Sequence, residues 1–280
     1  MRIDLHTHSV ASDGTETPGE VMAAAAAVGL DVVALTDHDT TIGWASAQAA
    51  VPDVGVALVR GAEISCRSTG RSVHLLSYLH DPQDPALLAE AERTRDARGG
   101  RARAIVERLS VDYEITWADV EEQTGQGATV GRPHIADALV ARGHVSGRAE
   151  AFTSLLAVGS PYYVHHHAPD AVHAVRLVRA AGGVPVLAHP GASARGRIVS
   201  DAEIERLAAA GLAGLEVGHR DNDDAQQRRL TSLADRLGLL VTGSSDYHGA
   251  GKPNRLGEWT TAPEVLAEIE SQGRLEVVRP

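Results

Sequence analysis

The chain has 280 residues, of which 43% are hydrophobic, and its formal net charge is -11 at neutral pH. A chain of this length can bury one large core. The acidic excess argues against broad electrostatic capture of nucleic acid, although a locally positive metal pocket could still attract a phosphate. The single cysteine, Cys66, excludes a disulfide framework or a thiolate zinc site within one chain and fits a reducing compartment.

The chain shows no sign of membrane targeting. Its first residues enter a strand-like segment at once, without the charged, apolar and small-residue order of a secretory signal. No apolar stretch approaches the length of a membrane span. We therefore expect a soluble, cytoplasmic protein with no membrane association and no obligate protein partner.

Short runs rich in Val, Ile, Leu and Ala alternate with helical patterns at both ends of the chain, which is typical of βα units and a largely parallel sheet. The expected strands lie near residues 2–6, 31–36, 56–64, 73–79, 184–188, 213–217 and 239–244.

Helix signals separate these strands. Thr17 and Glu20 form the pattern of a reciprocal N-terminal cap, and Gly29 predicts the end of the same helix. Ser200 and Glu203 repeat the start signal before a second helix. A third helical pattern ends in the same way at residue 238.

The middle of the chain differs, because residues 86–160 contain helical patterns and no convincing strand. We interpret this stretch as an inserted all-helical cap subdomain on an α/β barrel formed by residues 1–85 and 161–280. The first helix of the cap is rich in arginine. A solvated helix face is the favoured explanation, ahead of a nucleic-acid-binding helix.

Histidines and carboxylates recur where the expected strands end. His6 and His8 are two residues apart, so on a strand both imidazoles project from one face at the carboxyl end, where barrel active sites lie. Asp246 and His248 repeat this spacing after the last strand. Each pair alone is a weak signal that a turn or cap residue could explain. Their recurrence indicates a multinuclear metal site in a hydrolase.

Nine side chains of this kind are too many ligands for one ion. They are His6, His8, Asp13, His38, Glu63, His74, His189, Asp246 and His248.

Seven motifs together resemble the PHP (polymerase and histidinol phosphatase) domain family, in the branch of small phosphoesterases that act on nucleotide phosphates. They are "DLHTHSVASDGTETP", "ALTDHDT", "GAEIS", "VHLLSY", "GRPHIA", "LAHPG" and "SSDYH". The resemblance covers nearly the whole chain. It implies a distorted (β/α)7 barrel with a trinuclear metal site, covered by a helical insertion.

The resemblance also implies how three divalent ions share the nine side chains. The sets are His6, His8, Glu63 and Asp246 for the first ion, Glu63, His74 and His189 for the second, and Asp13, His38 and His248 for the third. Nitrogen and oxygen ligands without thiolate suit manganese, iron or zinc, and the sequence does not choose among them. Magnesium fits so many histidines less well.

The hypothesis for the reaction is hydrolysis of a phosphate monoester by in-line attack of a hydroxide that bridges two ions. The catalytic candidates are Asp246, Glu63 and His248. Asp246 or a nearby histidine would move the proton, and the acid for the leaving group is not assigned.

Substrate selection is expected in the cap. Pro133 fits a first helical position, which places Arg132 at the helix cap beside His134, where free backbone N–H groups and a guanidinium fork could hold a phosphate. Composition alone favours a surface ion pair for Arg132 and packing for His134, whereas the resemblance favours substrate binding. Arg195 and Arg197 could meet a second phosphate or remain solvated in a loop.

Besides His134, seven histidines fall outside the implied ligand set. We expect residues 165–167 to be a surface or hinge feature, and packed or exposed positions for the others, which are His80, His144, His173 and His219.

The favoured activity is a phosphatase acting on a nucleoside 3',5'-bisphosphate or a nucleoside monophosphate. The alternatives are a phosphodiesterase or 5'-3' exonuclease on short oligonucleotides, a histidinol-phosphate phosphatase, a non-catalytic metal-binding module and a carbon–nitrogen hydrolase. Only 3% of residues are aromatic, which limits stacking surfaces for long single strands and favours small substrates.

Overall fold

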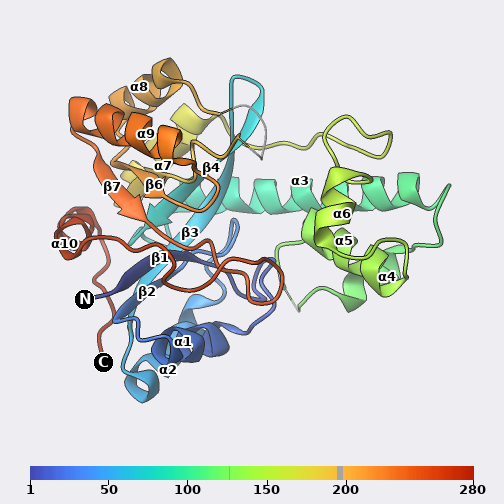
Figure 1. Cartoon of the computed structure of the whole chain (residues 1–280), viewed down its shortest axis with the longest axis horizontal. Coiled ribbons are helices and arrows are strands. Elements are labelled where there is room, and N and C mark those ends of the chain that lie inside the picture. The colour runs from blue at the N-terminus through green and yellow to red at the C-terminus, as the bar shows by residue number, and fades with distance from the viewer. Residues whose placement is uncertain (126, 194–197) are drawn as a thin grey trace.

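The computed structural model describes residues 1–125, 127–193 and 198–280. All seven expected strands are present and form one sheet in chain order (Figure 1). The strands are β1 (Ile3–Thr7), β2 (Val32–Leu35), β3 (Ala57–Ser68), β4 (Arg71–Tyr78), β5 (Val184–Leu187), β6 (Gly214–Gly218) and β7 (Leu240–Gly243). Thr7 pairs with Tyr247 just beyond β7, so the sheet curls into a nearly closed barrel.

The barrel is distorted by one reversed strand. β4 runs antiparallel to both β3 and β5, whereas the other neighbouring strands are parallel. β3 and β4 form a long hairpin whose two turn residues, Thr69 and Gly70, have φ values of 46° and 82°. Two successive positive φ values are typical of the turn that suits the twist of a hairpin.

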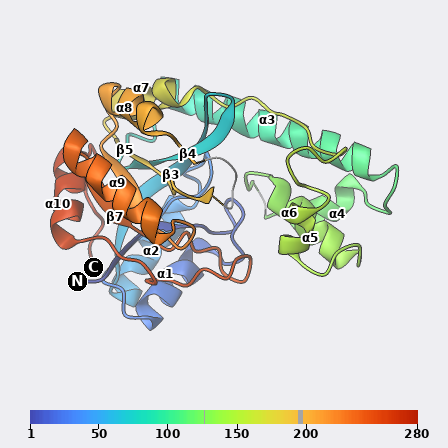
Figure 2. The same ribbon diagram turned by 45° about the horizontal axis from the view of Figure 1, so that its top comes forward.

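Helices of the described residues pack around the barrel (Figure 2). They are α1 (Pro18–Ala27), α2 (Trp44–Val54), α7 (Ala171–Ala180), α8 (Asp201–Ala209), α9 (Asp224–Leu237) and α10 (Pro263–Gln272). The predicted cap of α1 by Thr17 and Glu20 is confirmed, as is that of α8 by Ser200 and Glu203. Gly238 ends α9 in the left-handed conformation that favours glycine.

Alternation along the strands divides the apolar side chains between two layers. Val59 and Leu76 belong to the cluster inside the barrel, together with Leu266 from α10. Val33 packs outward against α1 and α2, and Leu215 packs outward against α7, α8 and α9. These layers fix the barrel wall from both sides and hold the strand ends in place.

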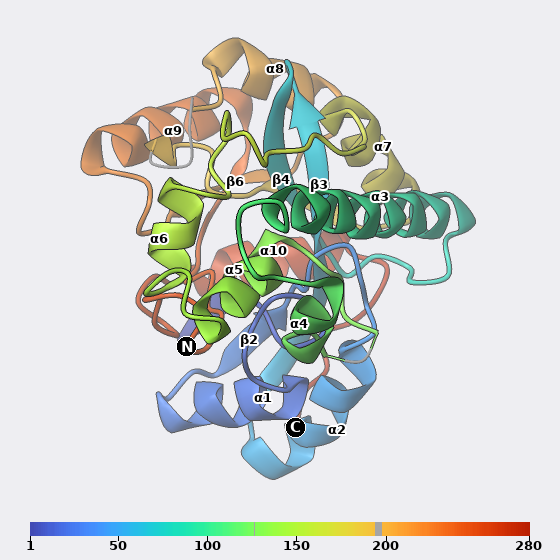
Figure 3. The ribbon, with the colours of Figure 1, turned by 90° about the vertical axis from the view of Figure 1, so that its right-hand side faces the viewer.

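The cap consists of α3 (Pro85–Leu109), α4 (Trp117–Glu122), α5 (Arg132–Ala141) and α6 (Arg148–Thr153). It has its own apolar cluster, in which Ile105 and Leu109 of α3 pack with Ile135 and Leu139 of α5. Seen from the cap side, α4, α5 and α6 lie in front of the barrel (Figure 3). The subdomain limits 86–160 stay a prediction. No helix in the described part of the chain is long and apolar enough to cross a membrane.

Candidate metal centre

Glu63, near the centre of β3, lies at the middle of the converging imidazoles. Its Oε1 lies 2.8 Å from His74 Nδ1 and 3.2 Å from His189 Nε2. Its Oε2 lies 3.3 Å from His6 Nε2 and 3.2 Å from His8 Nε2. β1 has a register irregularity between Asp4 and Thr7, in the part of the strand that carries His6.

Asp13, in the loop after β1, forms a second focus. Its Oδ1 lies 3.2 Å from His248 Nε2, and its Oδ2 lies 3.7 Å from His38 Nε2. The other ring nitrogen of His38 lies 3.2 Å from Glu63 Oε2, so the two foci are contiguous. All four side chains are buried.

Asp246 closes the cluster from the loop after β7. Its Oδ1 lies 3.5 Å from the Nε2 atoms of both His6 and His8. Its Oδ2 accepts a hydrogen bond from Lys252 Nζ at 2.9 Å and lies 3.5 Å from His219 Nε2. The two oxygens therefore face different surroundings.

Potential ligand atoms lie within 4.8 Å of one another in three groups. They are His6, His8, Glu63 and Asp246, then His8, Asp13, His38 and His248, and finally His38, Glu63 and His74. The first group equals the predicted first set, and the second contains the predicted third set plus His8. The third has His38 where His189 was expected. The structure thus brings all nine predicted side chains together, and the number of ions and their division stay a prediction.

Hydrogen bonds on the outer side of the rings fix where the free nitrogens point. His6 Nδ1 donates to Glu216 Oε1 at 2.9 Å, which leaves Nε2 with its lone pair toward His8 Nε2, 3.1 Å away. His248 Nδ1 donates to the backbone oxygen of Asp246 at 2.8 Å, and its buried Nε2, which lies 3.2 Å from Asp13 Oδ1, has no hydrogen-bond partner among the described residues. A cation placed between these lone pairs and the carboxylates would satisfy both, so the residues fit divalent metal ions.

Electrostatics place Glu63 and His248 in the protonation states of metal ligands. Burial alone would raise the pKa of Glu63, but the imidazoles of His74, His38 and His6 hold it well below its usual range. Burial and the charge of Lys252 lower the pKa of His248 to about 4. A neutral imidazole and an ionised carboxylate are the forms that bind metal. Burial alone would lower the pKa of His6 and His8, but the surrounding carboxylates raise both, that of His8 to about 9, so these two rings must release a proton when they bind metal.

Backbone strain accompanies the site. His189 and Asp246 have φ values of 31° and 54°, in the left-handed region that non-glycine residues rarely adopt. Asp39, which accepts hydrogen bonds from Ser65, also has a φ of 54°. Such conformations persist where the surrounding structure imposes them, and they cluster at functional sites.

Two buried residues of the site were missed from the sequence. Glu216 on β6 bonds His6 and also accepts the backbone N–H of His189 at 2.8 Å. His219, expected to be an ordinary histidine, lies against Asp246. A carboxylate in the apolar strand "GLEVG" was the available signal, because glutamate is rarely buried without a partner.

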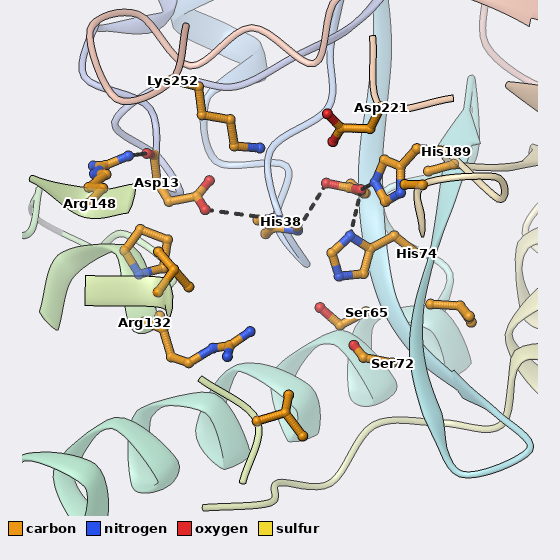
Figure 4. A pocket seen from close by; sticks show the side chains of 18 of the residues that line it. Asp13, His38, Ser65, Ser72, His74, Arg132, Arg148, His189, Asp221 and Lys252 are labelled. Atoms are coloured by element: carbon orange, nitrogen blue, oxygen red, sulfur yellow. Dashed lines mark hydrogen bonds and ion pairs between the residues drawn. The ribbon is translucent and has the colours of Figure 1, made fainter. Parts of the chain in front are cut away.

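A cavity of about 880 Å³ lies between the metal cluster and the cap. The barrel contributes acidic and imidazole groups, and the cap and neighbouring loops contribute basic groups. The charged and imidazole lining residues include Asp13, His38, Glu63, His74, Arg98, Arg101, Arg132, Arg148, His166, His189, Arg220, Asp221 and Lys252. Arg132 and Lys252 extend into the cavity from opposite sides (Figure 4).

The prediction that the arginines of the first cap helix, α3, form a solvated face is wrong for two of them. The side chain of Arg98 is only 12% exposed, and its Nη1 donates to Ser65 Oγ at 2.7 Å and contacts Asp39. Arg101 donates from Nε to Val164 O at 2.7 Å and lines the cavity. The inward side of α3 could not be identified before the position of the barrel was known.

α5 starts at Arg132, one residue earlier than predicted, because Gly131 is the N-cap and Pro133 is the second helical residue. Arg132 lines the cavity, whereas buried His134 is not among the lining residues. The Nδ1 of His134 instead accepts the backbone N–H of Gly131 at 3.1 Å. Substrate contact by His134 stays a prediction.

Arg195 and Arg197 lie outside the described residues, so their predicted roles stay predictions. Of the histidine triplet, His165 and His167 are exposed as expected, whereas His166 lines the cavity. His173 is exposed as expected.

A nearly closed (β/α)7-type barrel, a mouth crowded with buried histidines and carboxylates, and a basic cavity above them define a metal-dependent phosphoesterase. The PHP domain matches residues 4–107. The chain is 34% identical over 286 residues to a 3',5'-nucleoside bisphosphate phosphatase of Chromobacterium violaceum, covering 99% of this chain and 98% of the relative. The chain belongs to the PHP domain family.

Two further similarities agree with this class. A 5'-3' exoribonuclease of Haemophilus influenzae is 32% identical over 248 residues, covering 88% of this chain and 90% of the relative. A solved structure from Bifidobacterium adolescentis, assigned as a metal-dependent phosphoesterase, is 44% identical with a TM-score of 0.95, covering 97% of this chain and 96% of the other.

Proposed function

We propose that the protein is a phosphatase that removes a phosphate monoester from a nucleotide, with nucleoside 3',5'-bisphosphates and nucleoside monophosphates as its substrate class. The observation that supports this most directly is the cavity, which has metal ligands on one side and basic side chains on the other. Its volume of about 880 Å³ lies within the usual range for a small-molecule site.

The proposed catalytic residues are Glu63, His248 and Asp246. Glu63 belongs to two of the ligand groups and sets their spacing, while His248 completes the group around Asp13. Asp246 offers one oxygen to the cluster and the other to Lys252, and it is the proposed proton acceptor. We propose that three divalent ions, of manganese, iron or zinc, are held there; when bound they would activate a water molecule for attack and neutralise phosphate charge.

Arg132 is the proposed phosphate clamp. Its Nη1 donates to Leu156 O at 2.9 Å, and its guanidinium lies 5.2 Å from the centre of the Phe152 ring and 5.8 Å from that of Tyr163. No carboxylate of the described residues forms an ion pair with it, so most of its donors remain for an anion. Arg101 lines the same cavity, and its buried Nη2, which has no hydrogen-bond partner in the described part of the chain, is a further donor for an anion.

The test combines metal analysis of protein purified without chelator with a screen for released inorganic phosphate. Nucleoside mono- and bisphosphates form the main panel, and histidinol phosphate is included for comparison. We expect bound transition metal and phosphate release from a nucleotide. Metal-replete protein that releases no phosphate from any nucleotide would refute the proposal and favour a non-catalytic module.

A second candidate is a 5'-3' exonuclease acting on short oligonucleotides, which the similarity to the exoribonuclease supports. Both activities use the same ligands but give different products. Incubation with a short 5'-phosphorylated RNA distinguishes them, because an exonuclease releases mononucleotides stepwise and a phosphatase releases inorganic phosphate and leaves the strand intact.

A further inference from the structure

Arg148, the first residue of α6, connects the cap with two loops of the barrel. Its Nη1 lies 3.3 Å from the backbone oxygen of Asp13 (Figure 4). The same Nη1 lies 3.3 Å from the backbone oxygen of Gly251. Its Nε and Nη2 donate to the two carboxylate oxygens of Asp137 on α5, both at 2.6 Å. One guanidinium therefore joins two cap helices to two barrel loops.

Both loops supply proposed ligands of one ion. Asp13 is itself a ligand in the loop after β1. In the loop after β7, the N–H of Gly251 donates to the backbone oxygen of His248 at 3.2 Å. The loops also join directly, because Thr15 donates its N–H to the same oxygen at 3.2 Å. Arg148 thus bonds the backbone beside the two side chains, Asp13 and His248, that must face each other.

The close approach at Gly251 leaves no space for a side chain. A Cβ added at Gly251 would overlap Arg148 Nη1, so a glycine lets the guanidinium reach the loop. The Arg148 side chain is 15% exposed, which indicates a packed contact between cap and barrel.

We propose that Arg148 couples the seating of the cap to ion binding at Asp13, His38 and His248. With the cap seated, Arg148 holds the two loops in the spacing that the ion needs. By reciprocity, an ion bound there stabilises the seated cap by the same factor. This inference rests on the proposed ligand assignment.

The shape of the guanidinium group explains why another residue at position 148 would join the cap and the barrel loops less well. The planar fork gives two donors to Asp137 and still presents Nη1 to the two carbonyls. A lysine keeps the charge but cannot make this set of bonds. Removal of outer partners of metal ligands usually weakens affinity by 10- to 100-fold, and contacts to the backbone favour the lower end, about tenfold.

The first experiment measures Mn²⁺ binding to metal-free full-length protein by titration calorimetry, with metal content determined in parallel. The test variants are Arg148→Lys and Asp137→Asn, and the matched control is Arg142→Gln, which breaks an Arg–Asp pair with Asp119 inside the cap. We expect both test variants to bind one ion about tenfold more weakly and the control to match the wild type. Test variants that bind every ion as tightly as the wild type would overturn the coupling.

The second experiment uses hydrogen exchange of the α6 amides in the wild type, with and without Mn²⁺, and Asp13→Ala for comparison. We expect Mn²⁺ to slow exchange in the wild type and to have no effect on α6 in the variant. If Asp13→Ala binds as many ions as the wild type, the ligand assignment fails. If it loses an ion while α6 exchange in the wild type ignores Mn²⁺, the assignment stands and the coupling fails.

Discussion

Replacement of Glu216 by glutamine tests how the outer hydrogen bonds set the state of the metal ligands. Burial would raise the pKa of Glu216, but His6 holds it at about 2, so the group is a carboxylate at neutral pH. One oxygen accepts from His6 Nδ1 at 2.9 Å and the other from the His189 backbone N–H at 2.8 Å. Glutamine keeps the size of the side chain but has only one acceptor oxygen.

The backbone N–H of His189 can only donate, so in the Glu216→Gln variant the amide oxygen would face it and the NH2 group would face His6. His6 Nδ1 must then accept, which moves the ring proton to Nε2 and removes the lone pair from the metal cluster. Restoring the ligand tautomer would make the His6 Nδ1–H face the NH2 group of the glutamine and leave a buried donor unsatisfied, which costs about 1–3 kcal/mol. Metal affinity at the His6 group should fall roughly 10- to 100-fold.

The assay is competition between metal-free protein and a calibrated chelator for Mn²⁺ or Zn²⁺. Glu203→Gln is the control, because Glu203 is also a buried carboxylate but bonds Ser200 and Ser68 rather than a histidine. We expect weaker binding for Glu216→Gln and unchanged binding for Glu203→Gln. Equal affinity in the wild type and Glu216→Gln would show that the tautomer argument is wrong.

Three further predictions follow from single contacts. Arg132→Ala should lower kcat/KM for a nucleoside bisphosphate by roughly 10- to 100-fold, since a hydrogen bond to a charged group contributes about 1.5–3 kcal/mol. Arg132→Lys should recover part of the loss. Steady-state kinetics of Arg132→Ala that match the wild type would contradict the role of Arg132 as a phosphate clamp. Asp13→Ala should lose one bound ion and most activity, which metal content and turnover measured on the same sample would check; full turnover at full metal loading would remove the role of this ion. Hydrogen bonds hold the pKa of Glu203 at about 2 despite burial, below its ordinary value of 4.5. The contribution of ionised Glu203 to stability is therefore complete above pH 4.5 and is lost as the pH falls toward 2. The difference in free energy of unfolding between the wild type and Glu203→Gln, measured in urea, should shrink over that interval and should not change between about pH 6 and 8.

Much of the fold could be predicted because the local signals agree with it. The capping pattern at Thr17 and the stop at Gly238 depend on a few neighbouring residues, and so they can be read without tertiary structure. The direction of β4 could not be predicted in this way. A strand alternates its side chains with the same period whichever way it runs, and the turn at Thr69 and Gly70 does not match a familiar hairpin pair.

In the site, too, the residues with a local sequence pattern could be predicted, and those that depend on tertiary structure could not. His6 and His8 were predicted because a spacing of two on a strand has a geometric meaning. Glu216 has no such partner nearby in the sequence, since it meets His6 only after the barrel closes. The inward direction of Arg98 likewise depends on where α3 lies against the barrel, which is tertiary information.

The positive φ of His189 implies a conflict between durability and catalysis. A glycine at this position would adopt the same backbone conformation without steric cost, and relief of such strain is worth on the order of 1–3 kcal/mol. The more robust polypeptide would then lack an imidazole beside Glu63. Selection of variants for thermal stability alone would favour replacement of His189 and so remove a proposed metal ligand. Engineering for stability should therefore keep His189 unchanged.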